Sequence, residues 1–76
     1  MNARRRKNVE KAVGMIADAR SILEDALSEE QEAYESMPES LQNGERGLAM
    51  EEYIAILDEA VSALEEVENN LEEIIS

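Results

Sequence analysis

A chain of 76 residues is long enough for one small domain, and this one contains neither cysteine nor histidine. Disulfides, thiolate metal sites and the commonest general base are therefore excluded. The Glu-x-x-His motif of carboxylate di-metal bundles and the glycine-rich phosphate loop are missing as well. We therefore expect a protein that is not an enzyme and that holds no cofactor and no metal ion.

The net charge of −12 is unevenly distributed along the chain. Residues 1–20 carry six Lys and Arg against two acids, whereas residues 21–76 carry 17 acids against one base, Arg46. An acidic body repels nucleic acids and anionic membranes, so neither is expected as a direct partner, and a basic protein surface fits better. Because no signal peptide and no long apolar stretch is present, we expect a cytoplasmic protein.

The first predicted element is a long helix over about residues 3–35. Its apolar residues recur in heptads. The first column is Val9, Ile16, Leu23 and Glu30, apolar except at Glu30, and the second column is Ala12, Ala19, Ala26 and Ala33. Two such columns over about four heptads are typical of a coiled-coil helix. The basic run Arg4–Lys7 opens this helix, and without aromatic neighbours it favours pairing with acids of the C-terminal helix, or disorder, over nucleic-acid binding.

A break over residues 36–44 follows. It contains the only proline, Pro38, and an Asn43-Gly44 pair, which is a turn signal. Ser36 and Glu39 have the spacing of a capping box, so we expect a short helical turn near residues 37–42. The sequence around this turn is more specific than a connector requires. It therefore gives a candidate contact surface, with a well-capped turn as the alternative, at Met37, Pro38, Leu41 and Arg46.

The second long helix is predicted over about residues 45–75. Its first column comprises Met50, Leu57, Leu64 and Leu71, and its second column comprises Tyr53, Ala60, Val67 and Ile74. If the chain folds back with its crease at Leu41 and Gln42, small residues of one helix oppose large residues of the other, as a well-filled core requires. Ala12 then faces Leu71, and Glu30 facing Tyr53 is the one polar layer. The sequence predicts a single all-α domain, residues 1–76, built as an antiparallel two-helix coiled-coil hairpin.

Both helices carry apolar residues beyond these columns. A two-helix hairpin covers only a narrow stripe of each helix, so the additional residues should be exposed and mark an interface. A second copy, completing a four-helix bundle, is one expected occupant, and a foreign protein bound in a groove is another. The residues concerned are Val13, Met15, Ile22, Leu27 and Tyr34 in the first helix and Ile54, Ile56, Val61 and Ile75 in the second.

An acidic doublet recurs every seven residues along the second helix. The doublets are Glu51-Glu52, Asp58-Glu59, Glu65-Glu66 and Glu72-Glu73. At ~1.5 Å per residue they stand about 10 Å apart on one outer face. Such a row is either a plain solvated surface or a regular negative surface that resembles a phosphate backbone and enters a basic channel. Its first three doublets are the candidate residues for binding a basic host protein.

The centre of the chain carries a characteristic run of residues. Residues 29–34 read Glu-Glu-Gln-Glu-Ala-Tyr, residues 37–42 Met-Pro-Glu-Ser-Leu-Gln, and residues 44–47 Gly-Glu-Arg-Gly. This run resembles short acidic helical proteins encoded by phages and prophages of Gram-positive bacteria. The resemblance transfers no functional residue, but it implies a host-cell cytoplasm as the setting. Small acidic phage proteins are often inhibitors of host nucleases or other host machinery, sometimes as DNA mimics.

The sequence therefore supports two functional hypotheses. The first is a non-enzymatic interaction module, a small acidic hairpin that binds a protein partner, itself or both. The alternative is an inhibitor whose acidic face imitates DNA and occupies the basic cleft of a host nucleic-acid-binding or defence protein.

Overall fold

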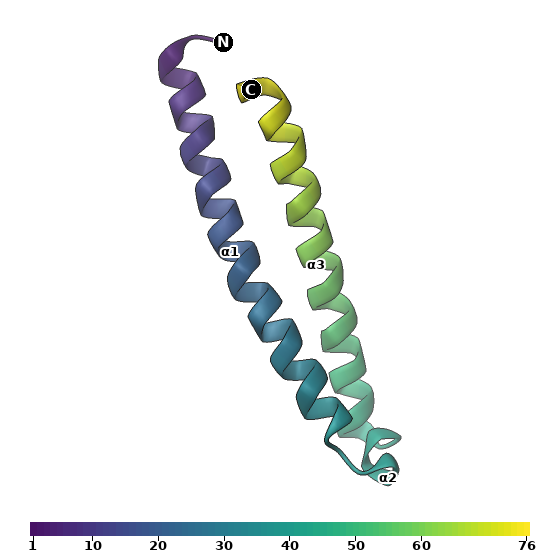
Figure 1. Ribbon diagram of the computed structural model, residues 1–76. Helices are drawn as coiled ribbons and strands as arrows, with labels where there is room; N and C mark the ends of the chain where they lie inside the picture. The colour runs from purple at the N-terminus through teal and green to yellow at the C-terminus, as the bar shows by residue number, and fades with distance from the viewer.

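A computed structural model describes all residues 1–76 and contains three helices, α1 (Ala3–Glu35), α2 (Glu39–Gln42) and α3 (Glu45–Ile75). The two long helices run antiparallel side by side, α2 covers one end of the pair, and both chain termini lie at the other end (Figure 1). The molecule is a rod of 58 × 15 × 14 Å. The predicted antiparallel hairpin is confirmed.

The helix ends show how the sequence sets the turn. Asn2 is the N-cap of α1, and its side-chain Oδ1 accepts a hydrogen bond of 2.9 Å from the backbone N–H of Arg5. Ser36 closes α1, and Pro38 is the residue before α2. The predicted capping box is therefore wrong, because Ser36 ends one helix and makes no cap for the next. Pro38 restricts its predecessor to extended backbone, which separates the two helices.

A close backbone approach fixes the tip of the hairpin against α3. A Cβ atom on Gly47 would lie 2.1 Å from the carbonyl oxygen of Gln42, so only glycine fits where α2 crosses the first turn of α3. The Gln42 side-chain Nε2 also donates a 2.9 Å hydrogen bond to the carbonyl oxygen of Tyr34, near the end of α1. The tip is thus tied to both long helices.

The residues that α1 and α3 turn toward each other form a seam, with spacings that alternate between three and four. On α1 the half-buried seam positions are Val9, Val13, Ile16, Arg20, Leu23, Leu27, Glu30 and Tyr34. On α3 the seam comprises Gly47, Met50, Ile54, Leu57, Val61, Leu64, Glu68, Leu71 and Ile75, of which Gly47, Met50, Val61 and Glu68 are buried and the others half-buried. The first predicted column of each helix therefore lies in the seam.

The second predicted column of each helix is wrong. Ala12, Ala19 and Ala33 are exposed on α1, and Tyr53, Val67 and Ile74 are exposed on α3. Only Ala26 and Ala60 of these columns are half-buried. The predicted layer of Glu30 against Tyr53 is wrong for the same reason: Tyr53 is 54% exposed. Six residues that were expected to be exposed flanks take their places, and all of them are half-buried or buried in the seam: Val13, Leu27, Tyr34, Ile54, Val61 and Ile75.

The side chains of α1 explain this rotation. Turning α1 so that Val13, Leu27 and Tyr34 replace alanines in the seam removes more apolar surface from water, at about 25 cal/mol per Å². α3 accepts either rotation, because it carries apolar residues on both sides of its leucine column. α1 therefore decides the orientation of both helices.

Candidate functional site

The rotation of the helices gives the rod two chemically different long sides. On α3 the residue after each Met50 or leucine of the seam is acidic, whereas the residue two positions further along is Tyr53, Ala60, Val67 or Ile74. Residues two positions apart on an α-helix point about 160° apart. The acidic and the apolar flanks of α3 therefore lie on opposite sides of the seam.

Contacts from α1 show that both helices share this division. Arg20 and Tyr34 reach carboxylates on the acidic flank of α3, at Glu65 and Glu51. Each alanine of the α1 column directly precedes Val13, Arg20, Leu27 or Tyr34 of the seam. These alanines therefore lie on the other side of the seam, beside the apolar flank of α3. One whole side of the rod is therefore apolar, and the opposite side is acidic.

We call the first of these sides the apolar face. It comprises Ala12, Met15, Ala19, Ile22, Ala26 and Ala33 of α1 with Tyr53, Ile56, Ala60, Val67 and Ile74 of α3. Its six larger side chains, those other than alanine, are between 40% and 69% exposed. Of the predicted flank residues, Met15, Ile22 and Ile56 lie here. Exposed apolar groups gathered on one side of a molecule, rather than scattered, mark a surface that another molecule covers.

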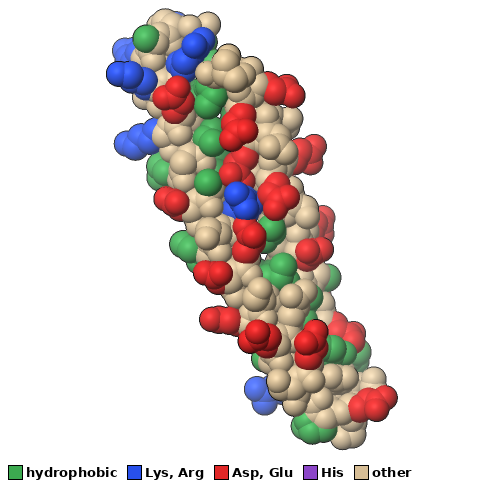
Figure 2. Space-filling view, in the orientation of Figure 1, with side chains coloured by type: hydrophobic (Ala, Val, Ile, Leu, Met, Phe, Trp, Pro, Cys, Tyr) green, Lys and Arg blue, Asp and Glu red, His purple; other side chains and the backbone are tan.

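The opposite side is the acidic face, which we define by the four doublets of α3 from Glu51-Glu52 to Glu72-Glu73. All eight carboxylates are exposed. Figure 2 shows acidic side chains along both long helices on one face, with most of the basic side chains at the end that holds the termini and others at the middle of the rod and near the tip. The six predicted partner-binding residues, Glu51, Glu52, Asp58, Glu59, Glu65 and Glu66, are all part of this face.

Arg20 is the centre of an ion-pair cluster inside the seam. Its Nε donates to Glu68 Oε2 at 2.5 Å, its Nη2 donates to Glu68 Oε1 at 3.3 Å, and it also pairs with Glu24. Glu65 Oε1 lies 4.0 Å from Arg20 Nη1. The hydrogen bond to Glu68 is the main reason that the pKa of Arg20 is raised, and it outweighs the desolvation that would lower it.

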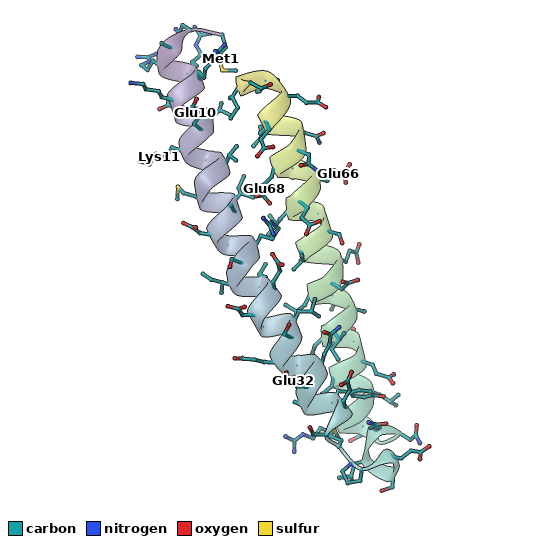
Figure 3. The ribbon with its side chains drawn as sticks, viewed as in Figure 1. Met1, Glu10, Lys11, Glu32, Glu66 and Glu68 are labelled. Atoms are coloured by element: carbon teal, nitrogen blue, oxygen red, sulfur yellow. The ribbon has the colours of Figure 1, made fainter.

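The orientation of Glu68 separates it from the neighbouring acids. Glu68 extends from α3 toward α1, whereas Glu66 points away from the seam (Figure 3). Glu68 is only 8% exposed and, besides the predicted Glu30, is a second inward-facing acid. This pair was not predicted from the sequence. The pattern that indicates it is one charged residue, Arg20, in a seam column of α1 and another of opposite charge, Glu68, in the matching seam column of α3.

Tyr34 ties the acidic face to the seam near the tip. Its hydroxyl donates a hydrogen bond to Glu51 Oε1. This bond, together with partial burial and the nearby negative charge, raises the pKa of the Tyr34 phenol above its ordinary value of 10.0. Glu51 and Glu65 therefore also contact α1, whereas the remaining acids of the face make no ion pair.

The tip contains an open apolar hollow of about 500 Å³. The structure brings all four predicted loop residues, Met37, Pro38, Leu41 and Arg46, to its lining, together with Ala33 and Met50. The basic run Arg4–Lys7 lies at the opposite end of the rod within the exposed first turns of α1. No ion pair joins this run to α3, so the expected pairing is wrong, and its helical backbone excludes the expected disorder.

No group of three acidic side chains is arranged to hold a metal ion, and no helix has the length and apolarity needed to cross a bilayer. No protein-family model, curated protein or solved structure matches the chain. The features that distinguish this molecule are therefore its two faces and the hollow at its tip.

Proposed function

We propose that the chain is a non-enzymatic interaction module that binds a protein partner, a second copy of itself included, through the apolar face. The observation that carries this proposal is the gathering of six large exposed apolar side chains on one side of the rod. The opposite side has no such gathering: there α3 carries a carboxylate doublet in every heptad, and Leu48 is its one large exposed apolar side chain.

The size of the internal core supports the same proposal. Only two apolar side chains, Met50 and Val61, are buried in the hairpin, and they are still 9% and 8% exposed, although 43% of the chain is hydrophobic. Small domains bury a modest fraction of their surface, and an extended hairpin buries less. A partner on the apolar face supplies the second layer that a helical domain normally has.

Site-specific photo-crosslinking in cells that produce the protein tests this proposal. A photo-reactive amino acid at Val67 probes the apolar face, and the same amino acid at Ser62, which is exposed elsewhere on α3, is the matched control. We expect discrete protein adducts from Val67, either with a foreign protein or at twice 8.5 kDa, and none from Ser62. Equal labelling at both positions, or no adduct at Val67, contradicts the proposal.

A second candidate function rests on the acidic face. Four doublets about 10 Å apart form a straight row of negative charge about 30 Å long. Such a row suits the basic cleft of a nucleic-acid-binding protein, because the cleft is built to neutralise regularly spaced phosphates. In this reading the chain is a phage-type inhibitor of a host nuclease or another defence protein.

Charge reversal distinguishes this second function from the first. The variant Asp58→Lys/Glu59→Lys removes the centre of the row while leaving the apolar face unchanged. If the acidic face binds a nuclease from a bacterial host, the tagged chain retains that nuclease at low salt, releases it at high salt and fails to retain it after charge reversal. Retention that is equal for the wild type and the charge-reversed variant excludes the acidic face as the binding surface.

A further inference from the structure

The geometry of the apolar face points to its occupant. We propose that a second copy of the chain covers it, lying alongside with its tip at the same end, so that α1 of each copy packs on α3 of the other. This inference rests on the proposed function, since it names the partner of the same face. It adds an orientation and a residue-level register.

The dimensions of the rod are sufficient for a stable dimer. The side of the rod that bears the apolar face has a 58 × 15 Å outline, which corresponds to about 870 Å² in projection. The face itself, from Ala12 to Ala33, occupies about 32 Å of that length at ~1.5 Å per residue. Stable protein pairs bury about 800 Å² on each partner. A second copy laid along the rod therefore covers an interface of ordinary size, with nothing added from outside the chain.

The distribution of charge permits two copies of such an acidic chain to meet. Continuing the columns of the apolar face by heptad steps in both directions reaches only three charged residues, Arg5, Glu29 and Arg46. The remainder of the net charge of −12 lies elsewhere on the molecule. Face-to-face association therefore keeps the acidic faces of the two copies apart, on the outside of a four-helix bundle.

Side-chain size selects the orientation. The α1 part of the face has a column of alanines, whereas the α3 part presents Tyr53, Val67 and Ile74. A two-fold axis parallel to the rod places three of the four alanines of each copy, Ala12, Ala19 and Ala33, against the large residues of the other, with neighbouring helices antiparallel. An axis across the rod instead places alanine on alanine and large on large, which leaves an interface of uneven thickness.

The register follows from contacts within one hairpin. Arg20 contacts Glu65 and Glu68, so the adjacent Ala19 is level with Val67. Tyr34 contacts Glu51, so the adjacent Ala33 is level with Tyr53. An axis parallel to the rod preserves these levels between copies, and at both of them one small residue then opposes one large residue. The level between them pairs Ala26 with Ala60, two small residues.

Distance measurement between labels tests the orientation. Because the chain has no cysteine, Ser40→Cys at the exposed tip provides a single attachment point for a spin label. With tips together, the two labels lie within about 30 Å, given interaxial distances of ~10 Å. We expect the same for Ser76→Cys at the other end, and a long distance when singly labelled Ser40→Cys and Ser76→Cys chains are mixed. A Ser40–Ser40 distance close to the 58 Å rod length overturns the orientation.

Solution mass tests the second copy itself. We expect sedimentation at twice 8.5 kDa for the wild type and for Ser62→Glu, and at 8.5 kDa for Val67→Glu and Ile56→Glu with helicity retained. A monomeric wild type at all concentrations overturns this inference, while protein adducts from the Val67 crosslinker still support the proposed function. A dimer unaffected by both apolar-face variants overturns the face as the site of self-association, and the Val67 crosslinker then decides the proposed function separately.

Discussion

Arg20 is held between the helices by carboxylates from both of them, and this makes it sensitive to substitution. Removing its guanidinium leaves Glu68, which is 8% exposed, without its charge partner. We predict that Arg20→Met lowers the melting temperature measured by circular dichroism, and by more than Arg46→Met, an exposed arginine that makes no ion pair. Equal effects of the two variants would show that the pair contributes nothing to stability.

Replacing both partners has a different expected outcome. In Arg20→Met/Glu68→Leu neither charge of this pair is left without its partner, and apolar side chains of similar volume fill the space. We predict that the melting temperature of this double variant returns to at least the wild-type value. A double variant as unstable as Arg20→Met would mean that the loss reflects packing around Arg20 and not the unpaired Glu68.

Two glycines give predictions of opposite sign. A Cβ atom on Gly14 meets nothing within 4 Å, so Gly14→Ala should stabilise α1 by roughly 0.5–1 kcal/mol through backbone entropy. A Cβ atom on Gly47 overlaps the Gln42 carbonyl, so Gly47→Ala should destabilise by about 1–3 kcal/mol because α2 has to move. Urea unfolding at one protein concentration measures both changes, and destabilisation by Gly14→Ala contradicts the first prediction.

Tyr34 gives the stability of the hairpin a dependence on alkaline pH. Its pKa is raised in the folded state, first by the hydrogen bond to Glu51, so the stabilisation is complete below pH 10.0. It is lost as pH rises through the folded-state pKa, because the phenolate cannot donate to Glu51. In a Tyr53→Phe background, ultraviolet titration should show Tyr34 ionising above pH 10.0, and closer to that value after Glu51→Ala. A Tyr34 titration that Glu51→Ala does not shift contradicts this assignment.

At the scale of the elements, the sequence was sufficient for the hairpin but not for the rotation of its helices. Pro38, Asn43 and Gly44 separate two long apolar periodicities, and this local chemistry identifies the break. The rotation depends on which flank of each leucine-bearing column is turned inward. α3 is apolar on both flanks, so its own pattern does not decide, and the larger side chains of Val13, Leu27 and Tyr34 on α1 do.

The same ambiguity explains the candidate surfaces. The acidic doublets lie at positions that are exposed in either rotation, so their exposure follows from spacing alone. The exposure of the apolar face does not follow from spacing alone, because it depends on the rotation of the helices. In the observed rotation the larger side chains of α1 lie in the seam, and its alanine column lies outside. Arg20 and Glu68 escaped detection since each is polar in an otherwise apolar pattern, and only the packed pair explains their positions.

At the scale of the whole molecule, the charge of −12 makes stability depend on salt. Doublets about 10 Å apart on α3 repel one another within the Debye length of ~30 Å at 0.01 M salt, and much less within the ~10 Å length at 0.1 M. We predict that sodium chloride raises the melting temperature between these concentrations at neutral pH. Neutralising part of the row by Glu59→Gln/Glu66→Gln, two exposed residues that make no ion pair, should reduce this increase.

The opposite effect of salt would have a specific meaning. The attractive pairs of Arg20 with Glu24, Glu65 and Glu68 are also screened, so a melting temperature that falls with salt would show that this one cluster outweighs the repulsion along α3. We expect the repulsion to dominate because the cluster lies in the seam, where screening is weak, while the doublets are exposed, where it is strong. Repeating the salt series with Arg20→Met separates the two contributions. If repulsion governs the response, the rise in melting temperature persists in this variant.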